Sequence, residues 1–135
     1  MNKLTGSVLS VESSDALVKI DVMCYDSKIV AFLLESTKRY DKVGANVSIL
    51  FKESEVSIAK NFSGLISLQN RFDCIITRVE LGELLAQITL NFHGNIIDSI
   101  ISSGSAKRMN LAVGDSVVAL VKSTEITLIM DNEDE

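Results

Sequence analysis

The chain of 135 residues contains no proline and no tryptophan, and only 5% of its residues are aromatic. Its core must therefore be built mainly from valine, isoleucine and leucine, and the β-branched residues among these favour strands. Cysteine is also scarce, because Cys24 and Cys74 stand alone, without a CxxC pair or a nearby histidine. This gives little support to a disulfide framework or a zinc site, and we expect two buried thiols.

Basic residues are few as well, since 13 lysines and arginines face 18 acidic residues and the net charge is −5. A nucleic-acid surface needs clustered positive charge, and an acidic chain is disfavoured at anionic membranes. No apolar run approaches the roughly 20 residues of a membrane helix, and no signal-peptide pattern opens the chain. We therefore expect a cytoplasmic protein that binds neither nucleic acid nor membrane.

Catalytic and metal-binding motifs are missing too. Nothing in the sequence matches a nucleophile elbow, a phosphate-binding loop or a set of metal ligands. The single histidine, His93, stands in a predicted turn beside Gly94, with no acidic or thiol partner at a suitable spacing. We predict that the protein is not an enzyme and that no side chain serves as a direct metal ligand.

What the sequence does contain is a repeat. Residues 44–58 (GANVSILFKESEVSI) and 114–128 (GDSVVALVKSTEITL) share Gly, Val, Leu, Lys and Glu at matching positions. Each copy alternates apolar and polar residues with the period of a half-buried strand, which predicts turn, strand, turn, strand. Lys52 and Lys122 each stand between two of these strands, which makes a lysine the first candidate for chemistry.

The repeat extends over the chain, with an offset of 68 at Asn2 and Asn70 (70 − 2) and of 70 at Gly44 and Gly114 (114 − 44). We assign residues 1–61 to repeat 1, residues 66–130 to repeat 2, and residues 131–135 to a disordered acidic tail. Further strands are predicted at 4–11, 16–22, 28–33, 84–92 and 96–101. A helical turn is predicted within 35–42 and within 102–112, where the second copy gains two residues.

Five short strands and one helical turn per repeat predict an all-β protein, a tandem pair of small five-stranded OB-like barrels. A repeat of about 65 residues buries little surface and is only marginally stable alone. Strands such as 96–101 (IIDSII) and 116–121 (SVVALV) are apolar on both faces, and a second apolar face needs a neighbour. We therefore expect a homo-oligomer, a trimer in preference to a dimer.

Four short motifs carry a resemblance. They are Ser67-Leu68-Gln69-Asn70, the serine-rich segment 102–105, the segment 109–114 (MNLAVG) and Lys122-Ser123. In this order they resemble the Mop/TOBE family of molybdate-binding domains, in the tandem di-Mop arrangement of molbindins and of the C-terminal half of molybdate-responsive regulators. The resemblance implies molybdate or tungstate as the bound ligand, no organic cofactor, and anion sites between subunits.

The resemblance also implies a set of oxyanion-binding residues. A tetrahedral dianion only accepts hydrogen bonds, so free N–H groups at the start of a helical turn, hydroxyl groups and a lysine suit it. The simpler alternative is that a serine such as Ser103 or Ser105 caps the helix and that Lys122 extends from a strand end into solvent. The expected site residues are Ser67, Gln69, Asn70, Ser102, Ser105, Ala106, Lys122 and Ser123.

Two departures from the family pattern affect this site. Gln69 stands where the family has an arginine, so a fixed positive charge is missing and the expected affinity falls. In repeat 1, Lys52 is followed by Glu53, whose carboxylate repels a dianion. We predict that Lys52 and Glu53 mark a degenerate second site.

Three functions are compatible with these features. The first is the storage, buffering or sensing of molybdate or tungstate. The second is a regulatory or partner-binding di-Mop module that has lost the ligand, which Gln69 and Glu53 favour. The third, an OB-type nucleic-acid binder, is the weakest, because such proteins stack bases on exposed aromatic residues in a basic groove.

Overall fold

The computed structural model describes residues 1–34 and 42–130. The helical turn predicted within 35–42 therefore lies, except for Lys42, outside the described residues, and so does the acidic tail 131–135. No helix in the described part of the chain is long and apolar enough to cross a membrane.

The elements are β1 (Asn2–Ser14), β2 (Leu17–Cys24), β3 (Ser27–Leu34), β4 (Asn46–Phe51), η2 (Glu53–Glu55), β5 (Ser57–Ala59), β6 (Asn70–Leu81), β7 (Leu85–Phe92), β8 (Asn95–Ser102), α1 (Ser103–Arg108), β9 (Ser116–Val121), η3 (Ser123–Glu125) and β10 (Thr127–Met130).

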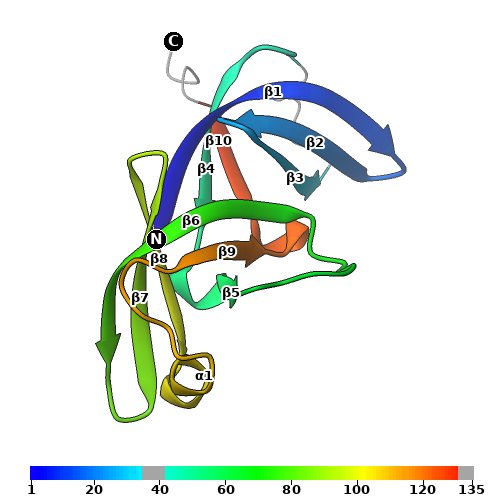
Figure 1. The fold of residues 1–135 in the computed structure, drawn as a ribbon. Helices are drawn as coiled ribbons and strands as arrows, with labels where there is room; N and C mark the ends of the chain where they lie inside the picture. The colour runs from blue at the N-terminus through cyan, green and yellow to red at the C-terminus, as the bar shows by residue number, and fades with distance from the viewer. Residues whose placement is uncertain (35–41, 131–135) are drawn as a thin grey trace.

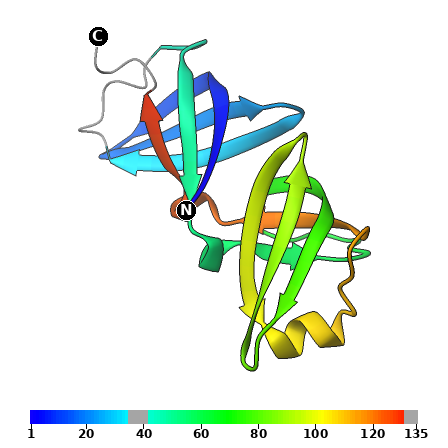
Figure 2. The same ribbon diagram turned by 90° about the vertical axis from the view of Figure 1, so that its left-hand side faces the viewer.

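The predicted all-β architecture is confirmed. Two five-stranded antiparallel sheets form, with strand orders β10-β4-β1-β2-β3 and β5-β9-β6-β7-β8. Each sheet curls around its own apolar face, and the two curled sheets lie side by side (Figures 1 and 2). The helical turn predicted for the second repeat is present as α1, between β8 and β9.

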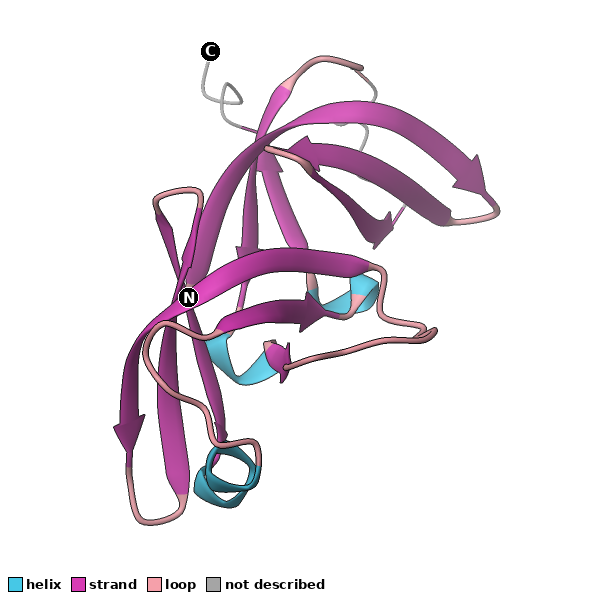
Figure 3. Cartoon of the chain, viewed as in Figure 1, coloured by secondary structure: helices cyan, strands magenta, loops and turns pink. Residues whose placement is uncertain are grey.

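Each sheet takes its fifth strand from the other repeat, which the sequence did not indicate. β5, from repeat 1, pairs with β9, and β10, from repeat 2, pairs with β4. The short 3-10 helices η2 and η3 carry the chain across, so that η2 contacts β8 and η3 contacts β3 (Figure 3). The sequence repeats 1–61 and 66–130 are therefore not identical with the two sheets.

The core runs from one sheet into the other. Phe51 of β4 lies 5.7 Å from Phe72 of β6, centroid to centroid, and Phe72 lies 5.1 Å from Phe92 of β7. All three rings are fully buried. Cys24 and Cys74 are buried free thiols, as expected, and burial raises their pKa to about 11 and about 12.

Candidate functional site

Lys122 lies where the repeat predicted it, immediately after β9 and at the start of η3. Its side chain is exposed, while Ser123 beside it is half-buried. Because η3 contacts β3, this lysine stands at the junction between the repeats. Lys52 has the equivalent position before η2, which contacts β8.

Asn70 has a structural role that sequence reasoning missed. Its side chain is completely buried, and its Oδ1 accepts a hydrogen bond from the backbone N–H of Val30 at 2.7 Å. Its Nδ2 donates to the carbonyl oxygen of Val30 at 3.0 Å. Asn2 makes the same pair of bonds with the backbone of Asp98. These two asparagines therefore bind each repeat to the outer strand of the other, Asn70 to β3 and Asn2 to β8.

Ser67 and Gln69 are exposed and lie directly ahead of β6. Asn70, the first residue of β6, is opposite Val121, the last residue of β9. The segments on either side of this pair therefore lie at the same end of the sheet. We call Ser67, Gln69, Lys122 and Ser123 the lysine half-site.

The other predicted residues gather around α1. Ser102 caps this helix, because its Oγ accepts a hydrogen bond from the N–H of Ser105 at 3.0 Å. The two hydroxyl oxygens are also 3.0 Å apart, and Ala106 is buried. Capping is thus part of the role of this segment, although the capping residue is Ser102 and not Ser103 or Ser105. We call Ser102, Ser105 and Ala106 the helix half-site.

The two half-sites lie at opposite ends of β6 within one chain. The lysine half-site surrounds the first residue of β6, whereas Ser102 pairs with Leu85, beyond the last residue of β6. A strand of 12 residues spans roughly 35 Å along its path. Figure 1 accordingly shows α1 well below β9, whereas the turn that follows β9 lies at its arrowhead. A small tetrahedral anion therefore cannot contact both half-sites of the same chain.

The equivalent region of repeat 1 contains carboxylates. Glu53 accepts a hydrogen bond from the terminal ammonium group of Met1, and this bond lowers the pKa of Glu53 below its ordinary value. A pocket of about 130 Å³ beside Lys52 is also lined by Glu55 and Glu125. These carboxylates disfavour a dianion near Lys52, and the degenerate second site stays a prediction.

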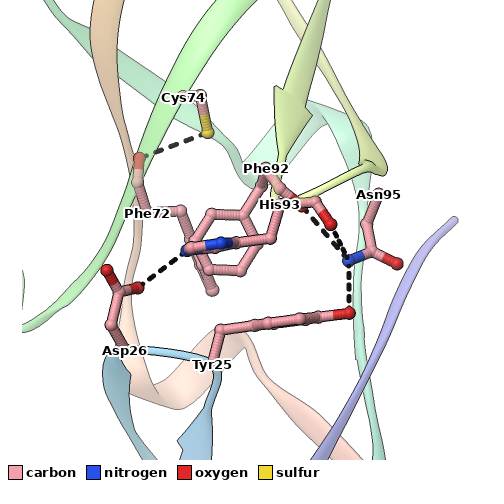
Figure 4. Close-up of polar contacts among 7 residues, drawn as sticks. All are labelled: Tyr25, Asp26, Phe72, Cys74, Phe92, His93 and Asn95. Atoms are coloured by element: carbon pink, nitrogen blue, oxygen red, sulfur yellow. Dashed lines mark hydrogen bonds and ion pairs between the residues drawn. The ribbon is translucent and has the colours of Figure 1, made fainter.

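His93 forms part of a contact between the two hairpin turns. Its ring stacks on Tyr25 with a centroid distance of 4.8 Å and lies against Phe92 edge to face. Its Nε2 is 3.0 Å from Oδ1 of Asp26, and Asn95 donates a hydrogen bond to the hydroxyl of Tyr25 (Figure 4). This cluster joins the β2–β3 turn to the β7–β8 turn. Among the described residues, no three His, Cys, Asp or Glu side chains are placed to hold a metal ion.

Comparison with known proteins gives a family match in the second half of the chain. Residues 66–128 match the family model of the TOBE domain. The resemblance to the Mop/TOBE family is confirmed. The TOBE segment begins just before the lysine half-site, contains the helix half-site, and ends inside β10.

Relatives from molybdenum transport match part of the chain. The molybdenum import ATP-binding protein ModC of Brucella abortus is 33% identical over 82 residues, which are 60% of this chain and 23% of the relative. The molybdenum transport protein ModE of Herbaspirillum seropedicae is 27% identical over 75 residues, which are 55% of this chain and 28% of the relative. The chain thus spans about a quarter of the length of these curated relatives.

One solved structure has the same fold over nearly its whole length. The cytoplasmic molybdate-binding protein ModG, determined with molybdate bound, superimposes with a TM-score of 0.89. The alignment covers 96% of this chain and 95% of ModG at 22% sequence identity. At this identity the likeness establishes the fold alone.

Proposed function

We propose that this protein binds the oxyanions molybdate or tungstate in the cytoplasm, as a store, a buffer or a sensor. The observation that carries the proposal is the TOBE match over residues 66–128, which include all the expected site residues. The partial matches to two molybdenum transport proteins and the shared fold with ModG support it. The anion is the only ligand that this function requires, without an organic cofactor and without catalysis.

We further propose that each anion is bound between two copies of the chain. The lysine half-site supplies a cation and hydroxyl groups, and the helix half-site supplies the hydroxyl-bearing start of α1. Within one chain these two half-sites lie at opposite ends of β6. A second copy can bring them together, so binding requires a homo-oligomer, for which a trimer is favoured and a dimer is the alternative. Nucleic acid and membranes are not partners in this proposal.

Calorimetry with molybdate, tungstate and sulfate in parallel tests the function. We expect molybdate or tungstate to bind with micromolar or better affinity. Sulfate should bind much more weakly, because a pocket of hydroxyl and backbone donors selects an anion by its size as well as its charge. Equal heats for the three anions, or no heat with any of them, would contradict the proposal.

The alternative is a di-Mop module that binds a partner without an anion. Gln69 favours it, since the lysine half-site lacks the second fixed positive charge, and so do the carboxylates around Lys52. Under this alternative the purified protein would remain oligomeric and give no heat with any oxyanion. The same titration therefore separates the two functions.

A further inference from the structure

The side chain of Lys60, the residue that follows β5, ends among three acceptors. Its Nζ donates to the carbonyl oxygens of Met109 and Asn110 at 3.1 and 2.8 Å, and it pairs with Oδ2 of Asp115 at 3.0 Å. An ammonium group has three N–H bonds, so each of them has an acceptor here. Only 22% of the side chain is exposed. Lys60 is therefore held in one place, unlike a lysine that extends into solvent.

The two carbonyl oxygens belong to the C-terminal end of α1. Met109 is the C-cap, and Asn110 after it has a left-handed backbone with a φ of 51°. Carbonyl groups at this end of a helix lack intrahelical partners and carry partial negative charge, which a lysine neutralises. α1 has only 6 residues, and a helix of that length is not stable by itself. Its position therefore depends on bonds such as these.

The same segment of repeat 1 also contacts the strand that leads into α1. The hydroxyl of Ser99, on β8, donates to the carbonyl oxygen of Val56 at 2.7 Å, and this bond is buried. Val56 precedes β5 and Lys60 follows it. The part of repeat 1 that crosses into the second sheet therefore binds the chain both before and after the helix half-site.

The equivalent positions of the other repeat lack the ion pair. At an offset of 70, Lys60 corresponds to Met130 and Asp115 corresponds to Ala45. The N–H of Ala45 nevertheless bonds to the carbonyl oxygen three residues before it, as the N–H of Asp115 does. The turn thus forms without the pair, which leaves the end of α1 as the structure that Lys60 stabilises.

We propose that Lys60 is a positioning residue of the oxyanion site, because it fixes α1 and with it the hydroxyl groups of Ser102 and Ser105. This role rests on the proposed function, to which the helix half-site belongs. Lys60 lies at the C-terminal end of α1, about 9 Å along the axis from its start. It acts through the helix and does not itself contact an anion there. Repeat 1 thereby controls the geometry of the site in repeat 2.

Hydrogen exchange tests the effect on α1 without any ligand. In Lys60→Met the amides of residues 105–111 should exchange about tenfold faster, the factor expected from the loss of a hydrogen bond to a charged group. The matched control is Lys107→Met, which removes an equal charge from an exposed position on α1 itself. Its exchange should equal that of the unmodified protein. Equal exchange in the two variants would overturn the proposal.

Calorimetry measures the effect on the site. Lys60→Met should bind molybdate about tenfold more weakly than the unmodified protein, whereas Lys107→Met should bind it equally well. The titrations are done without denaturant, at a temperature at which circular dichroism shows each chain fully folded. A purely structural role would lower the urea midpoint and leave this affinity unchanged, and that result would overturn the proposal.

Chemical rescue identifies the ammonium group as the cause. In Lys60→Cys, alkylation with 2-bromoethylamine rebuilds a side chain of nearly lysine length with a terminal ammonium group, and molybdate affinity should return. Alkylation with iodoacetamide adds a neutral group and should leave binding about tenfold weaker. Burial raises the pKa of Cys24 to about 11 and that of Cys74 to about 12, so neither thiol reacts at about pH 8.5. Equal affinity of the two alkylated proteins would overturn the proposal.

Asp115→Asn is a milder second variant, which keeps the charge of Lys60 and removes that of one acceptor. Its affinity for molybdate should fall about threefold. If Lys60→Met does not fold, an unchanged affinity of Asp115→Asn overturns the proposal. If the unmodified protein binds no oxyanion, the proposed function fails and the role of Lys60 fails with it. Equal binding by the unmodified protein and by Lys60→Met overturns the role of Lys60 alone.

Discussion

Lys122 is the side-chain cation of the lysine half-site. Its substitution should lower the affinity for the anion without changing the free energy of unfolding. Lys122→Ala should cost about 1.5–3 kcal/mol of molybdate binding, the range for a hydrogen bond to a charged group. The free energy of unfolding should hardly change, because the side chain is exposed. Calorimetry and urea unfolding measure the two quantities. Lys52→Ala is the matched control and should leave binding intact; an equal loss there would show that repeat 1 also binds an anion.

Asn70 is the opposite case, because its substitution should lower the free energy of unfolding. Asn70→Ala leaves the backbone N–H and carbonyl of Val30 buried without their partner, which should lower the free energy of unfolding by about 2–4 kcal/mol. Asn2→Ala breaks bonds that are only partly buried, so its cost should be smaller, about 1 kcal/mol. Urea denaturation compares them. A larger loss for Asn2→Ala would contradict the assigned burial.

For single residues, the sequence predicted the position of a side chain within a strand or helix better than its hydrogen-bond partner. The places of Lys122 and Ser102 follow from local patterns, a strand end and a helix start, and the structure shows both. The partner of Asn70 could not be foreseen, because Val30 lies 40 residues away on the other sheet. The predicted capping residue, Ser103 or Ser105, was wrong, because Ser102 caps the helix. Helix ends are fixed by backbone geometry, which a run of serines does not distinguish.

Among the elements, the strands and α1 follow from periodicity, but the exchange of β5 and β10 does not. β4 and β9 occupy equivalent positions in the repeat and share valine at 47 and 117 and leucine at 50 and 120. β5 and β10 also resemble each other, so either could pair with either partner without changing its buried face. The choice depends on the paths of η2 and η3, which contact β8 and β3. Such contacts between distant segments leave no mark in a local pattern.

The exchange predicts how an isolated repeat behaves. A fragment of residues 62–135 has β10 but lacks β4, with which β10 pairs in the whole chain, and it also lacks β5. We expect such fragments to exchange β10 between copies and to sediment as dimers or larger assemblies. A folded monomer of this fragment would show that η3 does not direct β10 away from its own sheet.

The ion pair between Lys60 and Asp115 predicts a pH dependence of stability. Asp115 accepts a hydrogen bond from the N–H of Ala112 and pairs with Lys60 at 3.0 Å. The backbone bond first, and then the lysine, hold the pKa of Asp115 below its ordinary value of 3.8. A carboxyl group whose pKa is lowered by folding stabilises the folded state above its ordinary pKa, and this contribution is lost as the pH falls through the lowered value.

Asp115→Asn removes this contribution at every pH. The urea midpoint of the variant should therefore lie below that of the unmodified protein at pH 7, and the difference should shrink as the pH falls to about 2. The comparison of the two chains cancels the titration of the other carboxylates. A difference that stays constant between these pH values would show that the pairing of Asp115 does not depend on its charge.

For the whole molecule, anion binding and assembly should be linked. If the site is complete only between two copies, molybdate binds the assembled, folded state and not the unfolded chain. The ligand then stabilises the protein by an amount that grows with the logarithm of its excess over Kd, about 2.7 kcal/mol at a hundredfold excess. We expect the melting temperature to rise with molybdate and with protein concentration, and to respond little to sulfate. Sedimentation equilibrium at micromolar concentration checks the assembly directly. A monomer of 14.7 kDa with and without molybdate would contradict the link between binding and assembly.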